Sequence, residues 1–316
     1  MHLTQPMPQP HATASGIGCL IAGIAIFSVQ DVILKRLSGA YPLYEALILR
    51  SLTALPFLFL FVHLNGGLRT LVSPGWRRML ARGFVMFAAY TCYYLTLAAL
   101  PLATTVALYF TGPLFITLLS VVLLKEPVGI RRWSAVIAGF LGVIIMVRPG
   151  SSFFDWAAVL GVSSGLTYGL SMVAARRLGA TETAAALAFW GNIVFLLCAI
   201  GLALIFGSGR FAADTHPSLA FLMRSWVTPS PADLLAMMAC GVIAATGLTL
   251  LTQAYRVAES SVVAPFEYTA MVWGVVFGWF FWREWPDAPG WIGIAIIVGA
   301  GLYVLYREGV RSGPPT

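Results

Sequence analysis

Charged residues are scarce in this chain. Asp, Glu, Lys and Arg make up 10% of its 316 residues, whereas they make up about 25% of an ordinary soluble domain. Hydrophobic residues account for 59%. A chain of this composition has too little polar surface to cover itself in water. The composition therefore excludes a soluble globular domain and indicates a membrane protein.

Motifs for chemistry are also lacking. The cysteines Cys19, Cys92, Cys198 and Cys240 lie far apart, without a CxxC pair, and the histidines form no cluster, so we predict no metal site. The chain has no HExxH and no GxxxxGK[ST] motif, which argues against an embedded enzyme and against ATP-driven transport. We therefore predict no catalytic residue and no cofactor. The net charge of +7 comes without a basic cluster interleaved with aromatics, so no nucleic-acid partner is predicted.

The chain is instead built from apolar blocks of about 20 residues, the length that crosses a hydrocarbon core of roughly 30 Å. Backbone groups in lipid must bond internally, so each block is predicted to be a helix. The ten blocks are 15–36, 42–64, 77–98, 103–124, 131–147, 154–175, 184–206, 233–254, 261–282 and 289–306. We predict an all-α membrane protein with ten transmembrane helices, a disordered tail at 1–15 and a cytoplasmic tail at 307–316. The longest connection, 207–232, has a mildly apolar middle that is too short to span.

The basic residues predict an orientation, because Lys and Arg accumulate in cytoplasmic loops. With the N-terminus inside, the inner connections hold eleven and the outer ones six. The inner residues are Arg69, Arg77, Arg78, Lys125, Arg131, Arg132, Arg176, Arg177, Arg256, Arg307 and Arg311; the outer ones are Lys35, Arg36, Arg148, Arg210, Arg224 and Arg283. This favours a multi-pass protein of the bacterial inner membrane with both termini in the cytoplasm.

The ends of the two halves repeat at an offset of 158 residues. Shifting the sequence by that amount places Glu126 on Glu284, Thr111 on Thr269 and Trp133 on Trp291. Chance similarity between apolar helices is the alternative. Five helices per half is an odd number, so the second copy, 151–306, would be inverted relative to the first, 16–150. Inverted repeats are typical of secondary transporters, whose solute site lies near mid-membrane between the halves.

The repeating unit resembles the EamA unit of the drug/metabolite transporter superfamily. The resemblance rests on FSVQDVILKRLSGAYPLYEALILRSLTALP, with Arg50 at the place of the family's arginine, and on the turns Lys125-Glu126-Pro127 and Arg283-Glu284-Trp285-Pro286. Trp285 departs from the Glu-Pro pattern. The resemblance implies a ten-helix carrier of organic solutes with a central cavity. Within the superfamily the chain looks most like bacterial amino-acid exporters of the YddG type, while other members carry riboflavin, S-adenosylmethionine, carboxylates or nucleotide sugars.

Charges inside membrane helices are costly and need a reason. Arg50 either pairs with Glu45 or Asp31 or binds a substrate carboxylate. Glu267 follows Pro265, which frees backbone carbonyls; it either neutralises a substrate ammonium, carries a proton, or pairs with an arginine such as Arg82.

Aromatic and hydroxyl side chains deep in the blocks suit an organic solute with one apolar part, and helix packing explains them equally well. The candidate binding residues are Tyr90, Tyr94, Tyr109, Thr111, Ser164, Tyr168, Trp190, Thr249, Gln253, Glu267 and Tyr268. We predict a secondary transporter, taken to be monomeric and surrounded by lipid, that exports aromatic and other neutral amino acids by alternating access. Uptake or exchange of another organic metabolite is the alternative, and a membrane-embedded enzyme is a more remote one.

Overall fold

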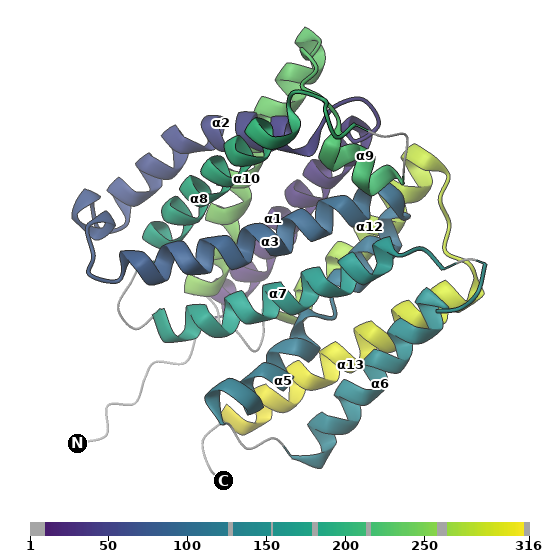
Figure 1. The fold of residues 1–316 in the computed structure, drawn as a ribbon. Coiled ribbons are helices and arrows are strands. Elements are labelled where there is room, and N and C mark those ends of the chain that lie inside the picture. The colour runs from purple at the N-terminus through teal and green to yellow at the C-terminus, as the bar shows by residue number, and fades with distance from the viewer. Residues whose placement is uncertain are drawn as a thin grey trace.

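The structure is a computed structural model that describes residues 10–125, 129–152, 154–178, 183–212, 216–257 and 264–312. In these ranges every regular element is a helix (Figure 1). The elements are α1 (Pro10–Leu37), α2 (Leu43–Leu64), η1 (Leu68–Leu71), α3 (Trp76–Ala99), α4 (Leu102–Tyr109), α5 (Gly112–Leu124), α6 (Ile130–Val147), α7 (Ala157–Leu178), α8 (Ala184–Phe206), α9 (Pro217–Met223), α10 (Pro231–Val257), η2 (Ala264–Tyr268), α12 (Thr269–Trp282) and α13 (Ala288–Ser312).

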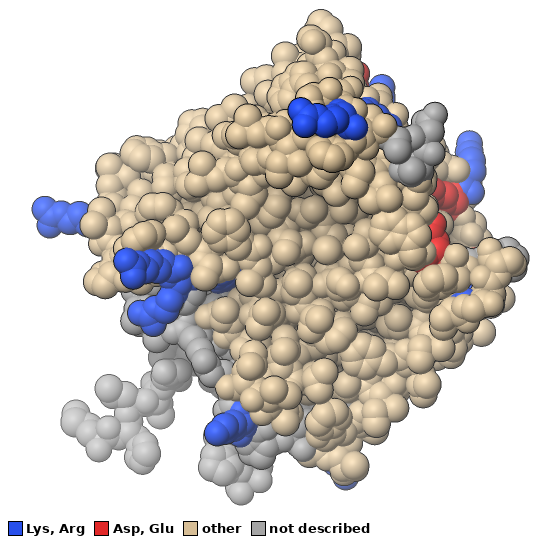
Figure 2. All heavy atoms as spheres, in the orientation of Figure 1, with Lys and Arg blue, Asp and Glu red and all other residues tan. Residues whose placement is uncertain are grey.

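Six helical stretches are long and apolar enough to cross a membrane. They are Ala14–Leu37, Leu43–Leu64, Leu102–Leu123, Ala157–Ala174, Ala185–Phe206 and Pro231–Leu251. Two shorter apolar helices, Trp133–Val147 and Ala288–Val304, accompany them. On the face drawn in Figure 2, charged atoms gather at the rim, and the broad middle is uncharged. An uncharged band between charged margins is what a lipid-facing surface requires.

The predicted disordered tail at 1–15 is too long, and α13 extends into the predicted C-terminal tail. The predicted disordered tail 1–15 contains the start of α1, which begins at Pro10; residues 1–9 lie outside the described residues. Proline suits the first turn of a helix because its missing N–H would have no partner there. At the other end α13 continues to Ser312, six residues past the predicted boundary at 306.

Two blocks predicted as single helices are broken. Between α4 and α5, Pro113 has no N–H for the carbonyl of Tyr109, and the helix is interrupted at Phe110–Thr111. The Thr111 hydroxyl donates to the Leu108 carbonyl at 2.6 Å. The block 261–282 contains the short η2 before α12, and there the Thr269 hydroxyl donates to the Phe266 carbonyl at 2.7 Å. Both donated bonds run three residues back and lie 158 residues apart.

The helices pack in matching pairs. The helix α1 packs along α10, and α3 packs along α7, while α2 packs on α8. The most extensive packing joins α6 to α13, beside α5 (Figure 1). Small residues allow this close approach: a Cβ added to Gly293 would lie 2.6 Å from the Met146 Cβ and 2.8 Å from the Gly142 carbonyl oxygen. The helices α6 and α13 therefore approach each other closely at Gly142 and Gly293.

The long connection 207–232 is anchored across the ends of three helices. Its helix α9 buries Phe221, which is 1% exposed, and the Ser218 hydroxyl donates to the Leu95 carbonyl of α3 at 2.7 Å. The Tyr44 hydroxyl of α2 donates to the Arg224 carbonyl at 2.7 Å, and an Arg224 nitrogen (NH1) donates to the Ser38 carbonyl at 2.9 Å. The connection thus covers one end of the bundle.

Candidate functional site

A cavity of about 330 Å³ lies at the centre of the bundle, where the two broken helices meet. Solute pockets in proteins span about 300–1,000 Å³, so this one is near the lower end. Its walls come from α1, α3, α4, α5, α7, α10, η2 and α12. The lining residues are Ile24, Phe27, Ser28, Gln30, Asp31, Arg82, Met86, Tyr90, Tyr93, Tyr94, Val106, Tyr109, Phe110, Pro113, Tyr168, Met172, Leu248, Leu251, Glu267 and Ala270.

One stripe of α3 forms the longest wall of the cavity. Arg82, Met86, Tyr90 and Tyr93 line it at spacings of four, four and three residues, the spacing of a single helix face. The stripe places a cation at one end and phenol groups at the other.

Hydrogen bonds hold the phenol end in place. The Gln30 amide donates to the Tyr94 hydroxyl at 3.0 Å and accepts from the Arg50 Nε at 3.2 Å. The Tyr93 hydroxyl donates to the Asp31 carboxylate at 2.8 Å. The carboxylate therefore has one oxygen fixed by α3 while its residue lines the cavity. Two adjacent residues of α1 are thus oriented by two adjacent tyrosines.

Aromatic rings enclose the middle of the cavity. The Tyr109 ring centroid lies 4.9 Å from that of Tyr168 and 5.3 Å from that of Tyr93. The Phe110 ring packs against Tyr268 at 4.7 Å. These separations are typical of favourable tilted and edge-to-face pairs. The rings present flat apolar surface with hydroxyl groups at its edge.

The structure brings six of the predicted residues together. Asp31, Tyr90, Tyr94, Tyr109, Tyr168 and Glu267 line the cavity. The neighbours Gln30, Tyr93 and Arg82 line it as well and were not among the predicted binding residues. The signal was present for α3, because Arg82 and Met86 continue the helical spacing of Tyr90 and Tyr94.

The other predicted residues lie outside the lining. The hydroxyls of Thr111, Ser164 and Thr249 donate to carbonyls of their own segments, Leu108, Gly161 and Ala245. Thr249 and Gln253 lie on the exposed side of α10. The residues of α10 that line the cavity are Leu248 and Leu251. The Trp190 indole donates to the Leu71 carbonyl at 3.2 Å, and Tyr268 lies beneath Phe110.

Of the two partners predicted for Arg50, Asp31 interacts with it electrostatically, whereas Glu45 has a different contact. Arg50 bonds Gln30, and its guanidinium lies 5.7 Å from the Phe195 ring centroid. Glu45 accepts from the Val227 backbone N–H at 3.3 Å, so it holds the 207–232 connection. Arg50 therefore acts on the cavity through Gln30, one residue removed from the lining.

Comparison with known proteins identifies the family of this chain. The sequence profile described as the EamA-like transporter family matches residues 14–148 and again 155–307. The chain belongs to the EamA-like transporter family. It is therefore a multi-pass membrane transporter, and the expected EamA resemblance is confirmed.

The relatives of this transporter are named for different solutes. It is 30% identical over 306 residues to a riboflavin transporter of Rhizobium johnstonii, covering 96% of this chain and 95% of that one. It is 24% identical to an S-adenosylmethionine uptake transporter of Rickettsia prowazekii, covering 93% of each chain. It is 29% identical to a pseudopaline exporter of Pseudomonas aeruginosa, covering 90% of this chain and 94% of that one. These names do not single out the YddG-type amino-acid exporters.

A solved crystal structure shares the transporter's fold. The TM-score is 0.59 at 17% sequence identity, and the match covers 96% of this chain and 100% of the other. At this identity the likeness concerns the fold alone.

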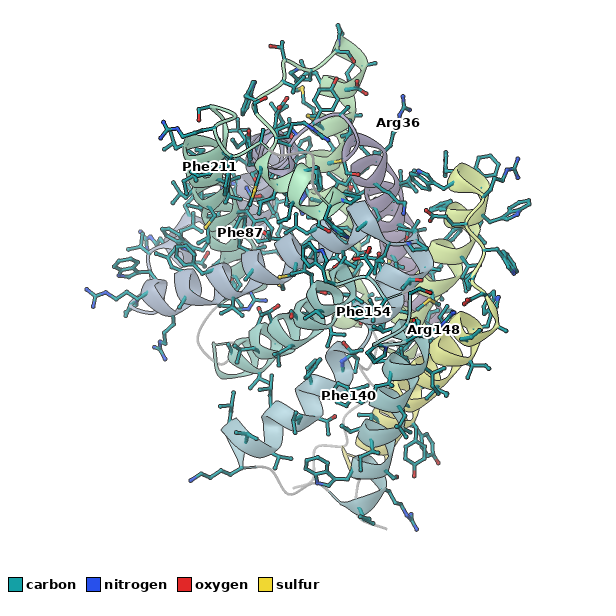
Figure 3. The ribbon with its side chains drawn as sticks, turned by 45° about the vertical axis from the view of Figure 1, so that its right-hand side comes forward. Arg36, Phe87, Phe140, Arg148, Phe154 and Phe211 are labelled. Carbon is teal, nitrogen blue, oxygen red and sulfur yellow. The ribbon has the colours of Figure 1, made fainter. Side chains whose placement is uncertain are left out.

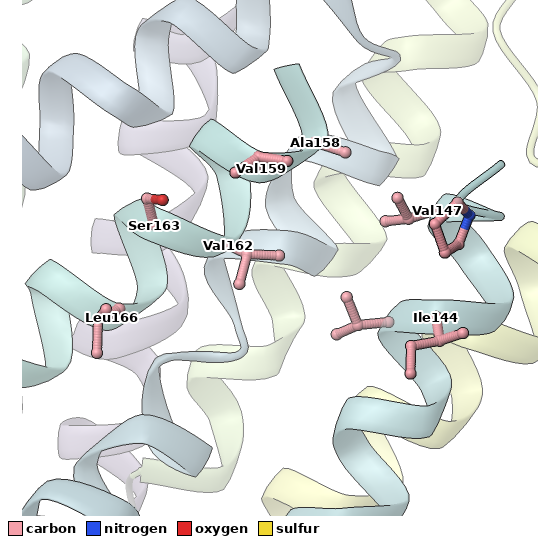
Figure 4. Close-up of a pocket in the computed structure, with 9 residues that line it drawn as sticks. Ile144, Val147, Ala158, Val159, Val162, Ser163 and Leu166 are labelled. Atoms are coloured by element: carbon pink, nitrogen blue, oxygen red, sulfur yellow. The ribbon is translucent and has the colours of Figure 1, made fainter. Parts of the chain in front are cut away.

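The transporter has a second pocket, between α6 and α7, of about 240 Å³. Figure 4 shows its walls, with Ile144 and Val147 from α6 facing Ala158, Val159 and Val162 from α7. Its lining is almost entirely aliphatic and offers no charged side chain. Such a surface suits a lipid chain, so the central cavity is the better candidate for a polar solute.

Proposed function

We propose that this transporter is a secondary carrier for a small organic metabolite with an aromatic or planar part. The observation that carries the proposal is the central cavity, where five tyrosines line the wall together with Asp31, Arg82 and Glu267. Aromatic faces bind the planar part through dispersion, and the charged groups fix its polar part. The intramembrane cost of those charges is justified when they contact a solute.

The carrier works by alternating access between two five-helix halves, 16–150 and 151–306, arranged as inverted repeats with ten membrane crossings. The broken helices support this, because Thr111 and Thr269 make the same hydrogen bond at an offset of 158. Phe110 and Tyr268 have the same offset and touch each other at 4.7 Å, as residues beside a two-fold axis do. Exchanging the halves also maps the α3–α7 contact onto α10–α1.

The cavity is compatible with more than one cargo. Amino-acid export, the prediction from sequence, fits the aromatic lining and the charges of both signs. S-adenosylmethionine, named for one relative, fits both features at least as well, and the planar ring system of riboflavin, named for another, fits the aromatic lining. An exported solute has a precedent in the pseudopaline exporter. We propose the inner membrane and cytoplasmic termini from the excess of Lys and Arg in the inner connections.

Flux through proteoliposomes tests the carrier function. Labelled L-tryptophan, riboflavin and S-adenosylmethionine are offered separately, with internal unlabelled solute to detect counterflow. We expect saturable flux of at least one solute, strongly reduced by Tyr90→Ala and unaffected by Thr249→Ala, which alters an exposed side of α10. Absence of saturable flux for all three would contradict the proposed cargo class, and linear flux without counterflow would contradict a carrier.

A further inference from the structure

Arg82 places a cation on the cavity wall. Among the described residues it forms no ion pair, and its Nε is buried without a hydrogen-bond partner. A guanidinium stays charged in proteins, and a charge at membrane depth costs about 2.5–3.5 kcal/mol even on insertion scales. None of the ion pairs among the described residues offsets this cost, so a group from outside the chain is a natural partner.

One acid of the lining, Asp31, is held by the part of α3 that lies farther along the helix than Arg82. Asp31 is bonded to Tyr93, which follows Arg82 by eleven residues on α3. At 1.5 Å per residue this is about 16 Å along the helix axis. The third charged residue of the lining, Glu267, acts electrostatically on Tyr109 and Tyr168, between the two ends. Between the two ends lie Tyr90 and Tyr109, which offer aromatic surface.

We propose that the cavity takes an elongated dipolar solute. Its anionic group, a carboxylate or phosphate, pairs with Arg82; its cationic group pairs with Asp31; its planar part lies against Tyr90 and Tyr109. An α-amino acid carries both charges on one carbon, so it engages both ends less well than a solute whose charges are separated. This inference rests on the proposed carrier function and narrows its substrate class by the distance between charges.

Two isomers separate charge spacing from size and composition. L-phenylalanine carries its ammonium and carboxylate on one carbon, whereas 4-(aminomethyl)phenylacetic acid carries them on opposite sides of the ring. Binding is measured on the purified full-length protein as thermal stabilisation over a concentration series. We expect the isomer with separated charges to half-saturate at a concentration at least tenfold lower than L-phenylalanine.

Variants assign the two ends. Arg82→Met and Asp31→Asn should each abolish the tenfold preference. Arg78→Met is the matched control, because Arg78 lies one turn earlier on α3 and is exposed, and it should leave the preference intact. If Arg82→Met does not fold, Arg82→Lys keeps the positive charge and should keep part of the preference, and Asp31→Asn still tests the opposite end.

Three outcomes overturn the inference: no binding of the separated-charge isomer, equal binding of both isomers, or a preference that survives Arg82→Met and Asp31→Asn. The carrier function is read separately from the flux of tryptophan, riboflavin and S-adenosylmethionine. Saturable flux with no isomer preference leaves the carrier standing and removes the dipolar solute. A preference without flux of those three solutes supports the dipolar site and contradicts that cargo set.

Discussion

Glu284 shows how one side chain can join three segments. Its Oε1 pairs with the Lys35 ammonium of α1 at 3.0 Å, and its Oε2 accepts from the Leu102 N–H, at the start of α4, at 3.0 Å. Lys35 also donates to the Leu100 carbonyl at 2.6 Å. The acidic group lies at a helix N-terminus, where the free N–H groups and the helix dipole favour negative charge. The Glu turn of the second half thus holds a helix of the first.

Glu284→Gln should lower stability by about 2 kcal/mol, between the values for surface and buried pairs, because it leaves Lys35 without its counter-charge. The measurement is the unfolding midpoint in detergent. Lys35→Met combined with Glu284→Gln should cost less than the sum of the single changes. Additive effects would show that the two side chains do not act as a pair.

A second ion pair makes the stability of the fold depend on pH. Arg148 follows α6 (Figure 3) and donates to the Asp287 carboxylate before α13; this bond holds the pKa of Asp287 below its ordinary value of 3.8. A lowered pKa stabilises the fold above the unfolded value, and that contribution is lost as the pH falls through the folded pKa. Because Asp287 is largely exposed, the effect is at most about 1 kcal/mol.

Asp287→Asn should therefore lower the unfolding midpoint slightly at pH 7. The difference from the unmodified protein should begin to shrink as the pH falls below 3.8 and should vanish below the lowered pKa of the folded state, where the native carboxylate is also neutral. High salt should reduce the difference as well, because surface pairs are screened. A difference that is constant from pH 7 to pH 3 would show that the side-chain shape, not its charge, matters.

At the level of helices, α13 offers a matched pair of glycines. A Cβ at Gly293 would meet the backbone carbonyl of Gly142 at 2.8 Å, whereas a Cβ at Gly299 would meet nothing within 4 Å. Gly293→Ala should destabilise the protein by roughly 1–3 kcal/mol, because α6 and α13 must separate. Gly299→Ala should be neutral or stabilising, since alanine favours the helix by about 1 kcal/mol.

Unfolding midpoints of the two variants in the same detergent provide the comparison. Equal midpoints would show that α6 and α13 are not tightly packed. Loss of stability in Gly299→Ala alone would show that the two faces of α13 have been assigned the wrong way round.

Helix positions could be predicted from the sequence to within a few residues for most blocks, because lipid imposes both length and internal hydrogen bonding. The breaks at Thr111 and before Thr269 could not, since hydropathy runs through them without interruption. Pro113 was the available signal for the first break, and Pro265, which frees backbone carbonyls, was the signal for the second. Which face of a helix meets the cavity was predictable on α3, from the spacing of its tyrosines. It was not predictable on α10, because Thr249 bonds its own backbone and Leu248 and Leu251 face inward.

At the scale of the whole molecule, the two halves have similar helices but contribute different side chains to the cavity. The offset of 158 relates Tyr90 and Tyr93 of α3 to Leu248 and Leu251 of α10, and all four line the cavity. It relates Arg82 to Cys240, which is fully buried. One wall is therefore polar and its counterpart apolar. In the proposed carrier, such a cavity would orient a solute with unlike ends, and the two halves would supply the alternating motion.

The orientation of the whole molecule in the membrane gives the last prediction. Counting Lys and Arg places the connection after α2 inside and the connection 207–232 outside. Single cysteines at Val72 and Ser208, both exposed, in a chain whose four native cysteines are replaced by serine, should report opposite sides. A membrane-impermeant maleimide should label Ser208→Cys in intact cells and Val72→Cys only after permeabilisation. The reverse pattern would invert the orientation. In the proposed ten-helix arrangement, the segment from α3 to α8 crosses the membrane an odd number of times, so the two positions lie on opposite sides. Labelling of both positions in intact cells would contradict this arrangement.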